Sequence, residues 1–480
     1  MAPSENCSTF FFTTKCGFPK SIFITEVFSN SLFLFQTKKS FLCTKIDGME
    51  KKRVNVVTMG CSKNLVDSEV LLNQLERGKF EVVHDSNETG FDAVFVNTCG
   101  FIHDAKQESI DMILDYVDAK KRGDIGKLYV MGCLSERYQK ELEQEIPEVD
   151  RYFGKFDLKA MVDELKVTYQ PEHIYERKIT TPSHYAYLKI AEGCNRSCAF
   201  CAIPMMTGRH KSRPIESLVK EAQYLAKKGT REILLIAQEL SYYGIDLYGK
   251  NRLPELIERI SEIEGIEWIR LHYLYPTKFP YEILPVMRDN PKVCKYLDMP
   301  LQHISNPVLK NMLRHVTREE TEALIHRIKE EVPGVILRTT MLVGFPGETE
   351  ADFQELKQFI IDTKFERLGV FPYSNEENTY AAKKFEDDVP EEIKQARADE
   401  IMETQQQISA ELNRQKIGRV FKVIIDRKED DYFVGRTEYD SPEVDGEVYI
   451  SSSSELEKGN FYQIKVTASG DYDLFGEVVG

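Results

Sequence analysis

Apolar runs of strand length alternate with segments of helical period from residue 51 onward. In the first part of the chain the predicted strands are VNVVTMG (54–60), FDAVFVNTCG (91–100) and KLYVMGCL (127–134). The predicted helices between and after them cover 65–77, 103–121 and 136–145. Repeated strand–helix units indicate a parallel sheet with helices on its faces. The sequence therefore predicts an α/β domain over 51–168.

A second alternating region follows the linker 168–184. Its predicted strands are 185–190, 231–237, 266–272, 295–299, 335–343 and 366–372. Its predicted helices are 215–228, 253–263, 280–289, 317–331 and 349–363, and a long polar helix (391–415) leads out. Six strand–helix units suit an open, partial (β/α)6 barrel better than a closed eight-fold one. We expect this domain to span 180–411.

The last segment, 414–480, changes to short alternating strands with Gly and Asp between them. These are VFKVIID, YFVGRTE, GEVYIS, FYQIKVTAS and DLFGEVV. Five short strands in so few residues predict a small β-barrel. The whole chain is thus predicted to be a multidomain α/β protein with a C-terminal β-barrel.

Residues 1–48 differ from everything after them, because they are rich in Phe, Ser and Thr and have no helical or strand period. They lack the charged and apolar regions of a secretory signal, and they contain no Arg, which a transit peptide needs. We expect a disordered extension or an over-long start assignment, with the fold beginning near Met49.

Composition and charge narrow the class of protein. The 480 residues include 63 Lys and Arg against 78 Asp and Glu, a net charge of −15. An acidic chain is a poor general binder of nucleic acid, because phosphate contacts need an excess of Lys and Arg. No apolar run is long enough to span a membrane. Ten cysteines, six of them in two groups of three, favour metal ligation in a reducing cytoplasm over disulfides.

The strongest motif is EGCNRSCAFCAIP, which places Cys194, Cys198 and Cys201 in one short loop after a strand. We call these three residues the core triplet. Three thiolates on a [4Fe–4S] cluster leave one iron without a protein ligand, so that iron can bind a cofactor or substrate. Structural zinc with His210 as a fourth ligand is the alternative, although zinc sites usually pair two closely spaced ligand pairs.

A second group consists of Cys61, Cys99 and Cys133, the N-terminal triplet, each of which follows an apolar strand. Carboxyl ends of successive parallel strands lie on one edge of a sheet, so the three thiols should converge there. We expect a second [4Fe–4S] cluster, again with an open iron. Three separately buried structural cysteines are the alternative, and that is the role expected of Cys294, which has no triplet partners.

The core triplet resembles the cluster loop of the radical S-adenosylmethionine (SAM) enzymes. In that superfamily SAM binds the open iron and is cleaved to a 5′-deoxyadenosyl radical, which abstracts a substrate hydrogen. By the same resemblance LVGFPGE (342–348), at the end of the fifth strand, is a SAM-contacting segment containing Gly344 and Gly347. Two glycines in a turn, taken alone, are more often structural.

Two triplets followed by a terminal barrel resemble the methylthiotransferases, which join an N-terminal domain, a radical SAM core and a TRAM barrel. The resemblance implies that one cluster generates the radical and the second delivers sulfur. It also implies two SAM molecules per turnover, as radical source and as methyl donor. An electron donor and a sulfur source are further implied partners.

Three motifs resemble the protein-modifying RimO branch of this family: MGCSKNLVDSE (59–69), YLDMPLQHIS (296–305) and GRTEYDSPEVDG (435–446). The tRNA branch typically has Gln-Met-Asn or Lys-Val-Asn where this chain has Ser62, Lys63 and Asn64. Many members carry Asp at the position of Glu239. The RimO resemblance implies methylthiolation of the β-carbon of an aspartate in small-subunit ribosomal protein twelve, free or on the subunit. The alternatives are a tRNA adenosine methylthiotransferase and a non-catalytic Fe–S electron carrier.

The charge of the last domain agrees with a protein substrate. Residues 414–480 carry nine Lys or Arg against fourteen Asp or Glu. An acidic barrel suits a basic ribosomal protein rather than tRNA, and we expect Asp440, Glu443 and Asp445 to face that partner. No acid–base residue is assigned. His103, His272 and His303 are polar candidates, each better explained as a packed or hydrogen-bonded side chain.

Overall fold

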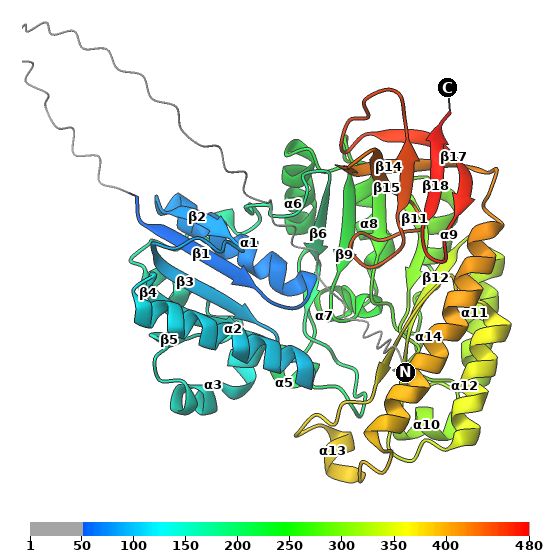
Figure 1. Cartoon of the computed structure of the whole chain (residues 1–480), viewed down its shortest axis with the longest axis horizontal. Coiled ribbons are helices and arrows are strands. Elements are labelled where there is room, and N and C mark those ends of the chain that lie inside the picture. Colours follow the sequence, from blue (N-terminus) through cyan, green and yellow to red (C-terminus); the bar gives the residue numbers. More distant parts are fainter. Residues whose placement is uncertain (1–50, 480) are drawn as a thin grey trace, which may run out of the picture. The chain divides into compact units, whose positions relative to one another are not determined.

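The computed structural model describes residues 51–479 (Figure 1), so the expectation for residues 1–48 lies outside the described part. The first domain contains a parallel five-stranded sheet with the strand order β2-β1-β3-β4-β5. Its strands are β1 (Arg53–Thr58), β2 (Glu81–His84), β3 (Phe91–Thr98), β4 (Ile125–Gly132) and β5 (Arg151–Tyr152). The three predicted strands are confirmed. The two edge strands β2 and β5 were not predicted.

Helices cover both faces of this sheet. They are α1 (Ser62–Arg77), α2 (His103–Arg122), α3 (Cys133–Glu145) and α4 (Leu158–Glu164). One apolar cluster joins the sheet to α2 and α3, and a second joins it to α1 and α4. Burial of apolar side chains on both faces explains why the strands read as nearly continuous hydrophobic runs.

The second domain is an open parallel sheet with the order β13-β12-β11-β10-β9-β6, which confirms the predicted six-stranded partial barrel. Its strands are β6 (Tyr185–Lys189), β9 (Glu232–Ile236), β10 (Trp268–Leu271), β11 (Val293–Asp298), β12 (Ile336–Val343) and β13 (Arg367–Pro372). The covering helices are α6 (Ile215–Lys227), α8 (Leu253–Ser261), α9 (Ile283–Asp289), α11 (Arg318–Glu331), α12 (Glu350–Thr363) and α14 (Glu391–Arg414). The largest apolar cluster lies between these helices and the sheet.

Short elements occupy the connections of this domain. They are η1 (Pro171–His173), β7 (Ala191–Glu192), α5 (Ile203–Thr207), β8 (Lys211–Ser212), η2 (Leu240–Tyr242), α7 (Ile245–Tyr248), α10 (Asn306–Asn311) and α13 (Tyr380–Lys384). Within residues 51–479 no helix is long and apolar enough to cross a membrane.

Helix α1 packs on the inner face of the six-stranded sheet as well as on its own sheet. Leu65 and Val66 of α1 share an apolar cluster with Tyr185 and Tyr187 of β6 and with residues of β9. The alternate residues of these strands, such as Leu188, face the outer helices. The segment that begins at Cys61 is therefore held at the mouth of the partial barrel.

The C-terminal segment forms the predicted small barrel, which is closed in the order β14-β15-β16-β18-β17. Its strands are β14 (Val420–Glu429), β15 (Tyr432–Thr437), β16 (Val448–Ser451), β17 (Phe461–Ser469) and β18 (Leu474–Val478). Ten buried apolar residues fill its interior. Closure removes the sheet edges that five short strands would otherwise expose.

The expectation that the acidic turn after β15 faces a partner is wrong for Asp440 and Asp445, whose side chains are buried, whereas Glu443 is exposed. Asp440 is 2% exposed and forms an ion pair with Arg367. Asp445 accepts a hydrogen bond from the Tyr296 hydroxyl (2.8 Å), and the Glu443 carboxylate accepts one from each of two tyrosines of β6. These carboxylates bind inner-face residues of the six-stranded sheet, because that face carries cations and hydroxyls which need acidic partners.

Candidate functional site

The N-terminal triplet lies at the carboxyl ends of three neighbouring strands. Cys61 precedes α1, Cys99 follows β3, and Cys133 is the first residue of α3. Strand β3 pairs with both β1 and β4, so the three strand ends are adjacent, as the spacing predicted. Gly60 has φ +84°, and a Cβ atom there would lie 2.8 Å from the Cys99 Cβ. Only glycine permits this close approach of the two loops.

The side chain of Asn64 ties the three loops together. Its Nδ2 donates to the carbonyls of Met59 and Thr98, both at 3.1 Å. Its Oδ1 lies 3.6 Å from the Cys133 Sγ. A buried amide satisfied in this way fixes the loops relative to one another, because breaking any of these contacts would leave a buried polar atom unpaired.

Two lysines give the N-terminal triplet a cationic surrounding. The Lys155 Nζ lies 3.8 Å from the Cys133 Sγ and also contacts Asp67 and Asn64. Burial by itself raises the pKa of the Cys61 thiol, but the ammonium groups of Lys63 and Lys155 outweigh it and lower that pKa below its usual value. The pKa of Cys133 is raised to about 12, mainly by burial. Binding of iron by this triplet would therefore displace thiol protons.

The core triplet occupies the loop between β7 and α5. The Cys201 N–H donates to the Cys198 carbonyl (3.1 Å), which closes the loop into a tight turn. The Cys198 Sγ lies 3.5 Å from the Tyr275 hydroxyl and 3.4 Å from Nη1 of Arg314. The backbone N–H of Arg196 points at the Cys194 Sγ (3.4 Å). Burial raises the pKa of the Cys194 thiol to about 11, so binding of iron at this residue would displace a proton.

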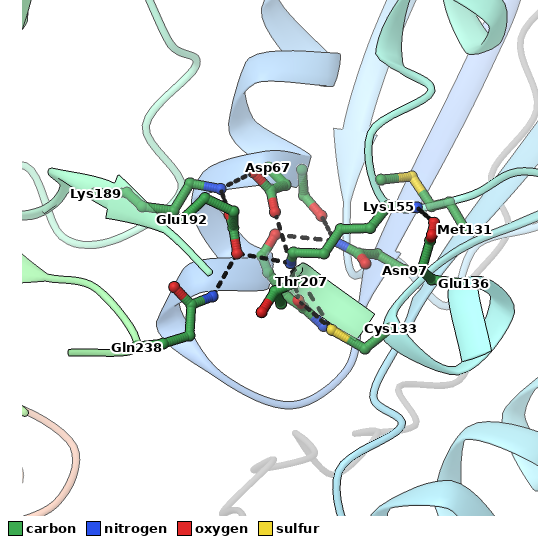
Figure 2. A network of polar contacts seen from close by, with 12 residues as sticks. Asp67, Asn97, Met131, Cys133, Glu136, Lys155, Lys189, Glu192, Thr207 and Gln238 are labelled. Atoms are coloured by element: carbon green, nitrogen blue, oxygen red, sulfur yellow. Dashed lines mark hydrogen bonds and ion pairs between the residues drawn. The ribbon is translucent and has the colours of Figure 1, made fainter. Parts of the chain in front are cut away.

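A network of charged side chains connects the surroundings of the two triplets (Figure 2). Lys155, beside Cys133, pairs with Asp67 (3.1 Å) and approaches Glu192 (4.0 Å). Lys189, at the end of β6, forms ion pairs with the same two carboxylates. Glu192 also accepts a hydrogen bond from Gln238, and it lies two residues before Cys194. The two predicted ligand sets thus border one partly buried group of charges, Asp67, Lys155, Lys189 and Glu192, which we call the charged wall.

The residues that connect the two triplets differ in whether a sequence signal marks them. Lys155 lies in an irregular segment before α4, where its burial has no local signal. Lys189 did carry one, since it directly follows the apolar run YAYL at the end of a strand. A charge at that place marks the carboxyl edge of a parallel sheet, where ligands bind.

Both triplets suit clusters better than single ions. Across residues 51–479 no three Cys, His, Asp or Glu side chains are close enough to hold one metal ion. A [4Fe–4S] cluster keeps its thiolates farther apart than a zinc ion does. The Nε2 of His210, the fourth ligand of the zinc alternative, lies 3.1 Å from the Ser212 hydroxyl instead. Thiols gathered on loops and flanked by cations are a donor set that fits anionic clusters.

The predicted SAM-contacting glycines form a turn after β12. Gly344 has φ +73° and Gly347 has φ +79°, a region that residues with a Cβ seldom adopt. The Gly344 N–H donates to Glu348 (2.8 Å) and the Gly347 N–H to Asp388 (2.8 Å). A Cβ at Gly344 would collide with the Lys394 side chain. The backbone conformation of the turn therefore explains why glycine occupies both positions, and the contact of these glycines with SAM stays a prediction.

The remaining candidates occupy ordinary positions. His103 is exposed at the start of α2. His272 is buried between Asp298 and Ser441, and His303 is buried beside Glu348. Cys294 is 1% exposed in an apolar cluster, as expected of a structural thiol. Glu239 pairs with Arg196 of the core-triplet loop (3.2 Å).

A cavity of about 200 Å³ lies behind the charged wall, between α1 and α4 on one side and α6 on the other. Lys155 and Lys189 line it together with Asp67. Its far side holds Arg177, which pairs with Glu69 (2.5 Å) and Glu221 (2.8 Å). Asp67, Lys155, Lys189 and Arg177 all have ion-pair partners across the two domains, so the cavity belongs to the junction of these domains.

Three family descriptions match consecutive parts of the chain. Residues 53–154 match the uncharacterized protein family UPF0004, residues 188–360 the Radical SAM superfamily and residues 417–479 the TRAM domain. These ranges contain the five-stranded sheet, most of the six-stranded sheet and the closed barrel, respectively.

Curated relatives match most of the chain. The ribosomal protein uS12 methylthiotransferase RimO of Bacteroides thetaiotaomicron is 56% identical over 432 residues, which are 90% of this chain and 99% of the relative. The protein of the same name from Porphyromonas gingivalis is 57% identical over 433 residues, 90% of this chain and 100% of the relative.

Among solved structures, the radical SAM methyltransferase TsrM of Kitasatospora setae, with cobalamin and a [4Fe–4S] cluster bound, has a TM-score of 0.51 at 15% identity. The similarity covers 67% of this chain and 72% of that chain. At this identity the likeness concerns the fold alone.

Proposed function

This chain belongs to the RimO family of ribosomal protein uS12 methylthiotransferases, and we propose that it attaches a methylthio group to the β-carbon of one aspartate in uS12. The observation that carries the proposal is the identity of 53–57% to curated relatives over about nine-tenths of the chain. The three domains are proposed to divide at 51–168, 180–411 and 414–480. We place the reaction in the cytoplasm, where small ribosomal subunits and reduced thiols occur together.

Membership of the Radical SAM superfamily implies one [4Fe–4S] cluster and SAM. Cys194, Cys198 and Cys201 are proposed to hold that cluster, which when bound would supply an electron for the reductive cleavage of SAM. Residues next to the core triplet position its sulfur atoms. The Arg314 guanidinium and the Tyr275 hydroxyl contact the Cys198 sulfur and hold it in place. We propose that Gly344 and Gly347 border the bound SAM.

Cys61, Cys99 and Cys133 are proposed to hold a second [4Fe–4S] cluster, from which sulfur is delivered. Asn64 holds the three loops in register, and Lys155 offsets the negative charge of the thiolates. The shared wall of Lys155, Lys189 and Glu192 keeps the two sites on facing sides of one junction. Two SAM molecules would be used per turnover, and an external electron donor and sulfur source are required.

The charge of the barrel supports a basic protein as substrate. Although Asp440 and Asp445 are withdrawn into the core, Asp430 and Asp431 at the β14–β15 hairpin are exposed. The domain keeps the excess of acidic residues that disfavours tRNA. Complementary charge would steer encounter with uS12, free or on the ribosomal subunit.

The test uses anaerobically reconstituted protein with uS12 and bulk tRNA offered together. Wild type should bind about eight irons and modify uS12 alone. Replacing the core triplet by Ala should halve the iron and abolish 5′-deoxyadenosine formation. Replacing the N-terminal triplet should also halve the iron, yet leave 5′-deoxyadenosine detectable without methylthiolation.

Each alternative predicts another result. Methylthio-adenosine in tRNA with unmodified uS12 would indicate the tRNA enzyme. Wild-type protein that forms no 5′-deoxyadenosine would be an electron carrier. Full iron and full methylthiolation without the N-terminal triplet would contradict the second cluster.

A further inference from the structure

Lys63 is a buried cation that lacks a directly paired carboxylate among the described residues, although its charge interacts with Cys61 and Glu192. Its side chain starts in the first turn of α1, two residues after Cys61, and the residue is 9% exposed. The Nζ atom lies 3.6 Å from the centre of the Tyr273 ring. Among residues 51–479 no carboxylate forms an ion pair with Lys63. Burial of an ammonium group without a carboxylate is costly, and a cation–π contact of about 2 kcal/mol recovers only part of that cost.

The neighbouring lysines differ from Lys63 in this respect. Lys155 pairs with Asp67 at 3.1 Å, and Lys189 pairs with both Asp67 and Glu192. The chain therefore supplies carboxylates for the two lysines of the wall and none for the lysine at its edge. Cys61 and Glu192 act on the Lys63 charge without a direct ion pair, so a ligand carboxylate can supply the contact that no described carboxylate makes.

The aromatic partner of Lys63 places it at the mouth of the partial barrel. Tyr273 follows β10, at the carboxyl end where α/β barrels bind substrates. Its φ of +63° is strained for a residue with a Cβ. Its backbone N–H donates to Asp298 and its carbonyl accepts from the Leu240 N–H, so both neighbouring loops hold this conformation. The strained Tyr273 thus lies against Lys63, which forms no ion pair with any carboxylate of the described residues.

The proposed substrate carries the missing anion next to the reacting atom. The β-carbon of aspartate is bonded directly to the side-chain carboxylate. A cation that binds this carboxylate therefore fixes the β-carbon within a short distance, and Lys63 lies between the N-terminal triplet and the barrel mouth. We propose that Lys63 binds the side-chain carboxylate of the substrate aspartate and so selects an acidic residue. This inference rests on the proposed function.

The test compares two forms of uS12 on the same enzyme preparation, one with the target aspartate and one with asparagine in its place. Wild-type holoenzyme should prefer the aspartate form by roughly 10- to 100-fold in kcat/KM, the value of a hydrogen bond to a charged group. In Lys63→Met the preference should fall to about threefold or less, because an uncharged side chain distinguishes the two poorly. Lys63→Arg, which keeps the positive charge, should retain most of the preference for the aspartate form.

Calorimetric binding of the two uS12 forms to holoenzyme gives a second readout and should show the same loss of preference in Lys63→Met. Because each ratio is taken within one preparation, partial loss of iron in a variant cancels. An unchanged ratio in Lys63→Met, with both substrates slowed equally, would overturn the assignment and place Lys63 with the sulfur-delivering cluster. Wild type that fails on the aspartate form would overturn the proposed function instead.

Discussion

Replacing Glu232 by Gln should loosen the junction between the six-stranded sheet and the C-terminal barrel. Glu232 is fully buried in β9, and its two oxygens accept hydrogen bonds from Nε of Arg270 and Nη1 of Arg436, both at 2.8 Å. Arg270 belongs to β10 and Arg436 to β15, so a single carboxylate joins the two domains. Both arginines are at most 2% exposed.

The expected loss of stability follows from the hydrogen-bond acceptors that each arginine retains in the variant. Arg436 retains Asp426 at 2.7 Å, whereas Arg270 keeps only the Glu438 carbonyl as an acceptor among the described residues. A buried guanidinium left without its carboxylate costs about 3–5 kcal/mol. We therefore expect the Glu232→Gln variant to lose about that much stability at this junction, although glutamine nearly preserves the shape of the side chain.

The chain contains its own reporter for this measurement. Trp268 is the single tryptophan, 3% exposed, and its ring lies edge-on to Phe461 of the barrel at 4.8 Å. Urea unfolding followed by tryptophan emission therefore reports on the junction. The midpoint should fall clearly in Glu232→Gln. It should stay nearly unchanged in the matched control Glu322→Gln, which removes an exposed pair with Arg318.

The pH dependence provides a further check. Burial raises the pKa of Glu232, but Arg436 and Arg270 together outweigh it and lower the pKa below its ordinary value of 4.5. A depressed carboxyl pKa contributes stability that is complete above the unfolded value and is lost as pH falls through the folded one. The difference between wild type and variant should be constant above about pH 6 and shrink below about pH 4. Equal midpoints at neutral pH would refute this reasoning.

Three other predictions concern the site and its frame. Lys155→Met should lower the reduction potential of the second cluster by on the order of 100 mV, whereas Lys189→Met should shift it less. The potential is measured by an EPR redox titration in a background variant whose core triplet is replaced by Ala. Glu376→Gln removes the carboxylate that binds Lys106 (2.8 Å) and Arg137 (2.9 Å), and should speed hydrogen exchange in α2; unchanged exchange would contradict this. A chain starting at Met49 should match the full chain in iron content and turnover, and selective inactivity would refute it.

Most of the fold followed from hydrophobic period alone. Long apolar runs such as 91–100 and 335–343 became β3 and β12, because central strands of a parallel sheet are buried on both faces. The edge strands β2 and β5 were missed, since four and two residues are too short for a pattern. Their pairing is decided by the neighbouring strand rather than by their own residues.

Side-chain contacts between domains could not be predicted from the sequence. The core triplet was predictable from the spacing of its three cysteines in one loop, and the N-terminal triplet because each of its cysteines follows a strand and strand ends share an edge. The acidic turn of the barrel was misread, since composition reveals the sign of Asp440 but not that Arg367 is its partner. Lys63 could not be singled out from the sequence for the same reason. A lysine is unremarkable there, and it becomes unusual only because the fold buries it without an ion pair to a described carboxylate.

The most direct test of the function is the position of the product on its substrate. Purified uS12, treated with reconstituted enzyme, SAM, reductant and a sulfide source, is digested and sequenced by tandem mass spectrometry. The account predicts one methylthio group in place of one hydrogen, on the β-carbon of a single aspartate, in the wild-type reaction and in none that lacks either triplet. A methylthio group found only on tRNA adenosine, or on uS12 after treatment without the N-terminal triplet, would contradict it.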